Sequence, residues 1–261
     1  MIVIKFGGHA MSDENGEFAS AISLAAQKQI PMVIVHGGGP QIDEELRHRG
    51  ISSTFEGGFR VTTPEIFDVV EEVLVSKVAP TIVNSLSRVG VHAVALSGRA
   101  SGILKARKLN SLVDGSEVDL GCVGVVTSVD TTAIDTALSK GELPIVSPVA
   151  SDDSTGLGMN VNADLSAAAI AGALNASVLI IMTDVAGIFR TWPDPESLIT
   201  EISASELEKI KSTFEKGMAP KVQACLDAIN AGARAVRIID GRQADSFSLA
   251  LAGSGGTLVN K

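Results

Sequence analysis

Two groups of glycines stand where backbone amides could bind an anion. Gly7 and Gly8 follow the apolar run 2–6, and Gly37 to Gly39 follow the run 32–36. A backbone without Cβ atoms lets its N–H groups approach a ligand closely, and a helix N-terminus behind it adds about half a positive charge. Either group could instead be an ordinary tight turn between a strand and a helix. Together they predict a phosphate site, although the signatures G-x-x-x-x-G-K-[ST] and G-x-G-x-x-G are absent from the chain.

Two lysines could neutralise such an anion. Lys5 ends the first apolar run, where a buried lysine is costly unless an anion pairs with it. Lys221 opens a predicted helix, at the end where the helix dipole disfavours a cation. A solvated surface position is the alternative for Lys221. We predict that both ammonium groups face a bound anion.

The segment MNVNAD, residues 159–164, offers polar groups of the other kind. Asn160, Asn162 and Asp164 alternate as on an extended strand, so all three could face one side before a helix that begins near Leu165. Asp164 could instead simply cap that helix. Arg60, in GGFRVTTPE, could bind a carboxylate through two parallel N–H groups, or it could lie on the surface.

The elements that must position these residues follow from an alternation of apolar runs with segments of helical spacing. The runs are continuous, as is typical of parallel strands buried on both faces, and cover 2–6, 32–36, 92–96, 143–149, 177–182 and 235–240. The predicted helices cover 17–29, 40–49, 64–88, 131–140, 163–174, 203–212, 218–232 and 243–252. This order predicts an α/β fold, a three-layer αβα sandwich around an open, mostly parallel sheet, with ligands at the carboxyl ends of the strands. Residues 105–127 break the rhythm and predict an antiparallel flap around Asp114-Gly115.

Composition narrows the class of protein further. With 261 residues and 45% hydrophobic content, the chain can bury a large core, in one unit or in two compact lobes that meet near residue 173. A net charge of -9 disfavours nucleic acid or an anionic membrane surface as a partner. No apolar run approaches the roughly 20 residues that span a bilayer. Two widely separated cysteines fit a reducing compartment, so we expect a cytoplasmic protein.

Taken together in chain order, these and neighbouring segments resemble the N-acetylglutamate kinases of the amino acid kinase family. The matching segments are KFGG (5–8), VIVHGGGPQID (33–43), GFRVT (58–62), VALSG (94–98), NVNAD (160–164), TDVAGIF (183–189), GMAPKV (217–222) and IIDGR (238–242). The match runs over essentially the whole chain. NVNAD, GFRVT and GM-x-PK are specific to the subfamily, whereas KFGG indicates only the superfamily.

The resemblance implies the amino acid kinase fold and a transferase that phosphorylates the γ-carboxylate of N-acetyl-L-glutamate with MgATP, in arginine biosynthesis. It implies that Lys5 and Lys221 stabilise the transferring phosphoryl group and that Asp164 holds both lysines in place. The implied substrate-binding residues are Gly38, Gly39, Arg60, Asn160 and Asn162. The implied nucleotide-binding residues are Gly7, Gly8, Gly37, Asp184, Gly187, Ile188, Phe189, Gly217 and Met218. Mg²⁺ would be held mainly by the ATP phosphates, without a metal site in the protein.

The implied reaction agrees with the residues present. A glutamate γ-carboxylate has a reference pKa near 4.3 and is already ionised at pH 7, so the nucleophile needs no general base. Phosphoryl transfer then depends on positioning and on neutralisation of charge, which lysines, glycine amides and Mg²⁺ can supply. Residues 1–172 would bind the acyl amino acid and dimerise, and residues 173–261 would bind the nucleotide.

Two other functions remain open on the sequence. The first is a sister kinase for carrier-protein-linked aminoadipate in lysine biosynthesis, which the loop SGRASG (97–102) leaves possible because relatives usually have an acidic or glycine-rich loop there. The second is a non-catalytic amino acid sensor, whose signature would be the loss of Lys5, Lys221 or Asp164; all three are present. The first apolar run begins at residue 2, so we expect a homodimer insensitive to arginine, not the hexamer of relatives with an extra N-terminal helix.

Overall fold

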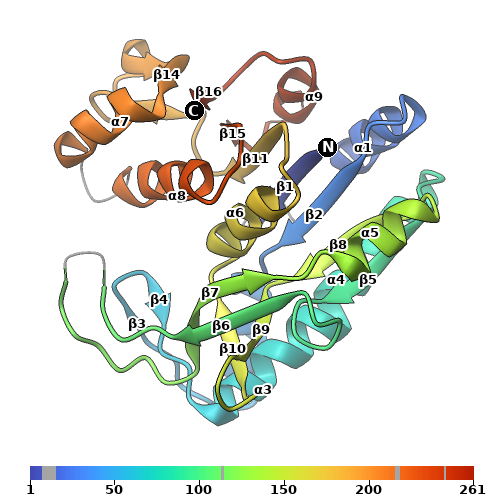
Figure 1. Ribbon diagram of the computed structural model, residues 1–261, viewed down its shortest axis with the longest axis vertical. Helices are drawn as coiled ribbons and strands as arrows, with labels where there is room; N and C mark the ends of the chain where they lie inside the picture. Colours follow the sequence, from blue (N-terminus) through green and yellow to red (C-terminus); the bar gives the residue numbers. More distant parts are fainter. Residues whose placement is uncertain (8–15, 113–114, 215–217, 244) are drawn as a thin grey trace.

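One twisted sheet organises the protein. The computed structural model describes residues 1–7, 16–112, 115–214, 218–243 and 245–261, and in these residues eight strands form a sheet in the order β14-β16-β15-β11-β1-β2-β8-β5 (Figure 1). The strands are β1 (Ile2–Phe6), β2 (Met32–His36), β5 (Ala93–Ser97), β8 (Leu143–Ser147), β11 (Val178–Thr183), β14 (Glu201–Ser203), β15 (Ala235–Asp240) and β16 (Thr257–Asn260). The ladders from β5 to β15 are parallel, and only β16 runs antiparallel to its neighbour β15 within this described sheet.

Helices cover both faces of the sheet. They are α1 (Glu17–Gln27), α2 (Gly39–His48), α3 (Pro64–Glu72), α4 (Ala79–Arg88), α5 (Thr132–Ser139), α6 (Ala163–Ala173), α7 (Ala204–Ile210), α8 (Ala219–Asn230) and α9 (Ser246–Leu251). Alternate residues of β1 enter different cores: Ile4 packs in the core formed with α1 and α4, and Val3 in the core formed with α6 and α8. The predicted three-layer αβα fold is therefore confirmed. No helix in the described ranges has the length and apolar character needed to cross a membrane.

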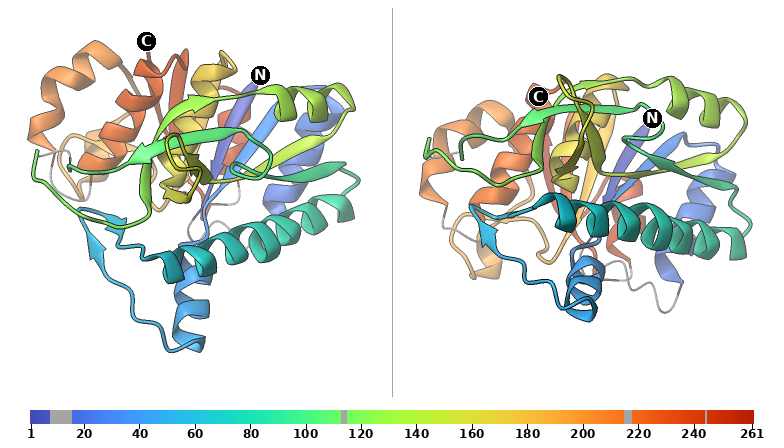
Figure 2. Two further views of the ribbon diagram at one scale, coloured as in Figure 1. Left: turned by 60° about the horizontal axis from the view of Figure 1, so that its bottom comes forward. Right: turned by 90° about the horizontal axis from the view of Figure 1, so that it is seen from below.

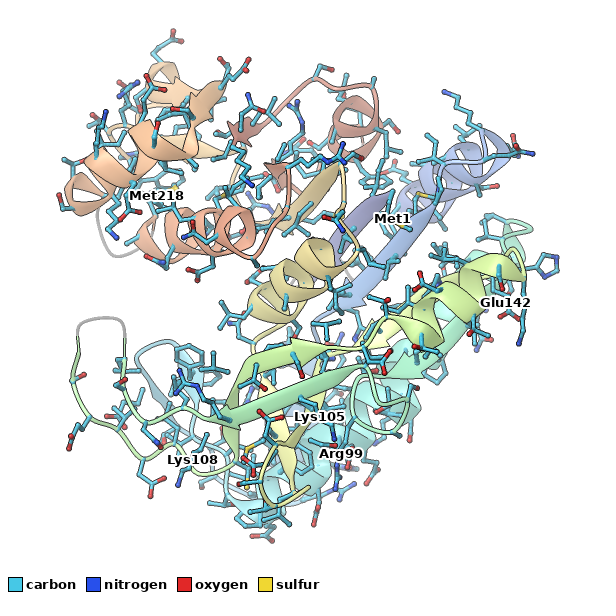
Figure 3. The ribbon with its side chains drawn as sticks, in the orientation of Figure 1. Met1, Arg99, Lys105, Lys108, Glu142 and Met218 are labelled. Atoms are coloured by element: carbon cyan, nitrogen blue, oxygen red, sulfur yellow. The ribbon has the colours of Figure 1, made fainter. Side chains whose placement is uncertain are left out.

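A small barrel adjoins the sheet. It consists of β6 (Leu104–Lys108), β7 (Val123–Val129), β9 (Val149–Asp152) and β10 (Gly158–Val161), and Figure 3 labels Lys105 and Lys108 on β6. The expected antiparallel pairing of β6 with β7 is correct, but the expectation of a simple flap is wrong, because β9 and β10 close the barrel. The predicted run 143–149 divides at Pro148, which has no N–H to continue the ladder of β8. The predicted turn residue Asp114 lies outside the described residues.

The long helix predicted over 64–88 forms one continuous rod (Figure 2), but it contains a π-helix, η2 (Val73–Val78), between α3 and α4. Pro80 lacks the N–H that a regular helix would use here, so the α-helical ladder cannot continue through it, and the wider turn lies immediately before it. This turn brings Leu74 against the glycines after β2. A Cβ at Gly38 would lie 2.5 Å from Leu74 Cδ2, so only glycine fits without a shift of Leu74.

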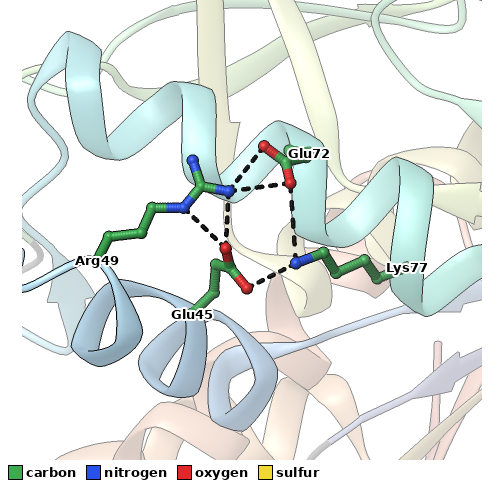
Figure 4. A network of polar contacts seen from close by, with 4 residues as sticks. All are labelled: Glu45, Arg49, Glu72 and Lys77. Carbon is green, nitrogen blue, oxygen red and sulfur yellow. Dashed lines mark hydrogen bonds and ion pairs between the residues drawn. The ribbon is translucent and has the colours of Figure 1, made fainter.

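Four charged side chains join α2 to the α3–η2 segment (Figure 4). Arg49 Nη2 lies 2.9 Å from both oxygens of Glu72 and 2.7 Å from Glu45 Oε1, and Lys77 Nζ lies 2.6 Å from Glu45 Oε2. The group lies at the surface, where screening by water and salt leaves an ion pair little net effect on stability. Burial of Ile42 and Leu46 therefore holds α2 in place more than these charges do.

Candidate active site

A cavity of about 290 Å³ lies beside the glycine turn that joins β2 to α2. Its walls include every residue that the sequence predicted to bind the acyl substrate, together with one glycine predicted to bind the nucleotide: Gly37, Gly38, Gly39, Arg60, Asn160 and Asn162. These residues come from the turn between β2 and α2 with the start of α2, from the short strand β4 (Phe59–Arg60), and from β10 and the N-cap of α6. The volume suits a small metabolite.

Arg60 is a buried cation in the cavity wall, and its neighbours fix the orientation of its guanidinium. Its Nη1 lies 2.7 Å from Asp43 Oδ1 and donates a hydrogen bond of 2.6 Å to Ser53 Oγ, and its Cζ lies 4.6 Å from the centre of the Phe55 ring. Asp43 and Phe55 line the same cavity. Sequence reasoning missed Asp43, although it lies four residues after Gly39 in a helix, a spacing that places it one turn along the same face.

The polar segment after β10 differs in detail from its prediction. Asn162 is the N-cap of α6, because its Oδ1 accepts hydrogen bonds from the backbone N–H of Asp164 at 2.8 Å and of Leu165 at 3.3 Å. The helix begins at Ala163, as the predicted range 163–174 has it, but a capping role for Asp164 is wrong because Asn162 is the N-cap. β10 ends at Val161, and the three polar side chains therefore do not share one strand.

Because Asn162 caps α6, the Asp164 carboxylate can pair with Lys5. Lys5 points from β1 to the same side as Val3, toward α6, and its Nζ lies 3.1 Å from Asp164 Oδ1. That oxygen is buried and has no hydrogen bond within the described part of the chain, so the Lys5 ammonium is its ionic partner. Gly7 lies against this ammonium, because a Cβ at Gly7 would be 3.0 Å from Lys5 Nζ. Gly8 lies outside the described residues.

Lys221 comes from the first turn of α8. Its Nζ lies 3.2 Å from Asp184 Oδ1, just beyond β11, which is the strand next to β1. Burial raises the pKa of the Cys225 thiol, one turn further along α8, and the Asp164 carboxylate adds to that rise. α8 packs against α6, the helix that carries Asp164. The family resemblance implies that Asp164 holds both lysines; the structure shows Asp164 beside Lys5 and Asp184 beside Lys221.

The remaining predicted nucleotide residues lie after β11 and at the start of α8. Gly187 allows the close approach of Thr257, whose Oγ1 accepts a hydrogen bond of 2.7 Å from the N–H of Ile188. The Ile188 and Phe189 side chains are buried in the core, and the two residues form the short strand β12 (Ile188–Phe189), which pairs with β13 (Leu198–Ile199). Met218 is buried at the N-cap of α8 (Figure 3). Gly217 lies outside the described residues.

His36 fixes the backbone at the beginning of the glycine turn. It is fully buried, with Nδ1 at 2.7 Å from the Gly37 carbonyl oxygen and Nε2 at 2.9 Å from Ser147 Oγ. Burial lowers its pKa from 6.5 to about 4, against a smaller opposing effect of the bond to Gly37. His36 is therefore neutral at pH 7. Since a carbonyl only accepts, Nδ1 carries the proton, and Nε2 is an acceptor for the Ser147 hydroxyl, which also lies 3.3 Å from the Leu74 carbonyl oxygen.

Glycine amides, lysines from separate elements and a pocket with a buried arginine, at the carboxyl edge of a parallel sheet, define a small-molecule kinase of the α/β class. The family model of the amino acid kinase family matches residues 1–240, and the chain belongs to that family. The family predicted from the sequence motifs is thus confirmed.

Similar proteins agree with this assignment. An acetylglutamate kinase of Paenarthrobacter aurescens is 46% identical over 259 residues, which cover 95% of this chain and 82% of the relative. An acetylglutamate kinase of Salinispora tropica is 44% identical over 250 residues, covering 95% and 84%. The crystal structure of smu.665 from Streptococcus mutans UA159 is similar with a TM-score of 0.81 at 27% identity, covering 99% of this chain and 98% of that chain.

Proposed function

We propose that this protein is an acetylglutamate kinase, which transfers the γ-phosphoryl group of ATP to the γ-carboxylate of N-acetyl-L-glutamate and forms N-acetyl-L-glutamyl 5-phosphate in arginine biosynthesis. The observation that carries the proposal is that a bare glycine turn and a buried arginine share one cavity. The turn suits a phosphoryl group, and the arginine suits the carboxylate at the other end of the substrate. Relatives of the same name, 41–46% identical, support it.

In the proposed reaction, the α-carboxylate of the substrate binds Arg60, whose orientation Asp43 fixes. An ionised γ-carboxylate oxygen attacks the γ-phosphorus in line, the new O–P bond forms as the bond to the bridging oxygen breaks, and ADP leaves without any proton transfer. Lys5 and Lys221 neutralise the charge on the migrating group, and the N–H groups of the glycine turn bind its oxygens. Asp164 and Asp184 hold the two ammonium groups in position.

We assign the predicted residues to two binding regions. Gly38, Gly39, Arg60, Asn160 and Asn162 bind the acyl amino acid, while Gly7, Gly37, Asp184, Gly187, Met218 and the backbone of Ile188 and Phe189 bind MgATP. Mg²⁺ enters with ATP and is held mainly by its phosphates, because the site carboxylates Asp164 and Asp184 already pair with lysines. Residues 1–172 form the acyl-binding lobe and residues 173–261 the nucleotide-binding lobe, a division supported by a cavity lined only by residues 37–163.

We further propose that the protein is a cytoplasmic homodimer. β5 is one of the two edge strands of the sheet in the described residues, and it presents the apolar residues Val94, Ala95 and Leu96 with exposed or partly exposed side chains. Such an edge favours pairing with another copy of the chain. Cys122 and Cys225 are both free thiols, as proteins in a reducing compartment usually have.

Trapping of the acyl phosphate with hydroxylamine tests the function. The purified protein should form a hydroxamate from N-acetyl-L-glutamate and MgATP at a rate far above that with carrier-protein-linked aminoadipate, and Lys5→Ala should abolish it. Preference for the aminoadipate conjugate would assign the sister activity. Absence of hydroxamate from every acid offered would refute a kinase of this class and favour an amino acid sensor.

A further inference from the structure

The turn after β15 is hydrogen-bonded to the turn after β11. These strands are parallel neighbours in which Thr183 pairs with Asp240 at the ends of the ladder. Two bonds continue the contact past the strand ends: the N–H of Gly241 donates to the Thr183 carbonyl at 2.8 Å, and Arg242 Nη2 donates to the Asp184 carbonyl at 2.6 Å. The second bond comes from a side chain and therefore depends on the residue at position 242.

The Arg242 guanidinium is itself fixed. Its Nε and Nη2 donate to the two oxygens of Asp240 at 2.9 and 2.8 Å, and its backbone N–H donates to Asp240 Oδ1 at 3.0 Å. The Asp240 side chain is only 8% exposed, and Arg242 holds the pKa of its carboxyl below the usual range, so the two form a lasting ion pair. A guanidinium can serve a carboxylate and a carbonyl at the same time, whereas the point charge of lysine cannot reproduce that geometry.

We propose that Arg242 is a positioning residue for phosphoryl transfer, acting through Asp184 on Lys221. Asp184 follows the last residue of β11 and has a mostly exposed carboxylate, which lies 3.2 Å from Lys221 Nζ. Arg242 fixes the backbone of Asp184, and the carboxylate of Asp184 in turn holds the ammonium group. This inference rests on the proposed function, which gives Lys221 its role. Displacement of a catalytic group by about 1 Å can cost about 100-fold in rate.

The test is the substitution Arg242→Lys. It keeps the positive charge but removes the planar guanidinium that binds the Asp240 carboxylate and the Asp184 carbonyl together. We expect kcat to fall about tenfold or more, with KM for N-acetyl-L-glutamate unchanged within about twofold, because other elements build its cavity. The matched control is Arg234→Lys, an exposed arginine just before the opposite end of β15, and it should leave both constants unchanged. In a Lys221→Ala background, Arg242→Lys should cause no further loss of kcat.

Two results would overturn the proposal: a kcat for Arg242→Lys equal to that of Arg234→Lys, or losses that multiply in the double variant. If Arg242→Lys does not fold, Asp240→Asn decides by the same two criteria. This substitution weakens the ion pair that holds the Arg242 guanidinium, while asparagine keeps the shape of the aspartate side chain. A wild-type protein that forms no hydroxamate would refute the proposed function instead. Calorimetry with AMP-PNP would then test whether Arg242 positions the Lys221 ammonium group for a bound nucleotide. A Kd for AMP-PNP that rises about tenfold in Arg242→Lys but not in Arg234→Lys supports this role, and an unchanged Kd overturns it.

Discussion

Mild acid should destabilise the protein through His36. The ring is fully buried and neutral, and burial lowers its pKa to about 4 from 6.5 in the unfolded chain. The unfolded chain therefore binds the proton first as the pH falls. The contribution of His36 to stability is complete above pH 6.5 and is lost as the pH falls toward 4.

The size of this loss follows from the shift. Each pKa unit corresponds to about 1.4 kcal/mol, so the shift of the His36 pKa to about 4 limits the total loss to about 3 kcal/mol. Between about pH 7.5 and pH 5.5 the same relation gives a loss of about 1 kcal/mol. Both pH values lie above the isoelectric point near 4.9, so the protein keeps a net negative charge throughout.

Urea unfolding at the two pH values measures the loss, with His36→Asn as the reference. Asparagine retains a donor for the Gly37 carbonyl but does not titrate, so all other pH effects cancel in the difference between the proteins. The advantage of wild type over the variant should shrink by about 1 kcal/mol in acid. An advantage that is equal at both pH values, or larger in acid, would refute the buried, neutral state of His36.

Three substitutions test the roles proposed for other site residues. Lys5→Ala and Lys221→Ala should each lower kcat by about 100-fold or more with little change in KM, because the charge that they meet develops during transfer; steady-state kinetics that show mainly a KM effect would contradict this. Arg60→Ala should instead raise KM for N-acetyl-L-glutamate about 30-fold, the equivalent of about 2 kcal/mol for hydrogen bonds to a charged group, and an unchanged KM would exclude it from the substrate site. Gly38→Ala should destabilise the fold by about 1–3 kcal/mol in urea unfolding through its clash with Leu74, and Leu74→Ala in the same chain should absorb most of that cost; full additivity would contradict the contact.

The central fold was predictable because its signals are local. β1, β2 and β15 were placed at their observed bounds, since a strand buried on both faces reads as one apolar run between polar segments. β9 was missed and β10 was expected only as an extended segment within 159–164, because each is short and is defined by distant partners. The only signal for the π-helix in the sequence is Pro80. A proline indicates that the α-helical hydrogen bonding is interrupted, but it does not predict which turn becomes a π-turn.

Within the site, the residue types were easier to predict than their partners. The glycine turn was predicted from its position after a strand, and Arg60 from its place in GGFRVTTPE. The structure places both, with Asn160 and Asn162, around one cavity. Asp43 and Arg242 were missed as contributors, because each acts through a contact with a residue far away in the sequence or on another turn. Asn162 was expected to lie on one strand face with Asp164, but it is the N-cap of α6, and its Oδ1 accepts from the backbone N–H of Asp164 while the residue still lines the cavity.

The most direct test of the account is a crystal structure with ADP, aluminium fluoride and N-acetyl-L-glutamate, in which the fluoride mimics the migrating phosphoryl group. We predict that Lys5 Nζ and Lys221 Nζ both lie within hydrogen-bonding distance of the fluoride, at about 3 Å, with Arg60 on the α-carboxylate. A complex in which either ammonium group points away from the fluoride would contradict the claim that the two lysines act on one phosphoryl group.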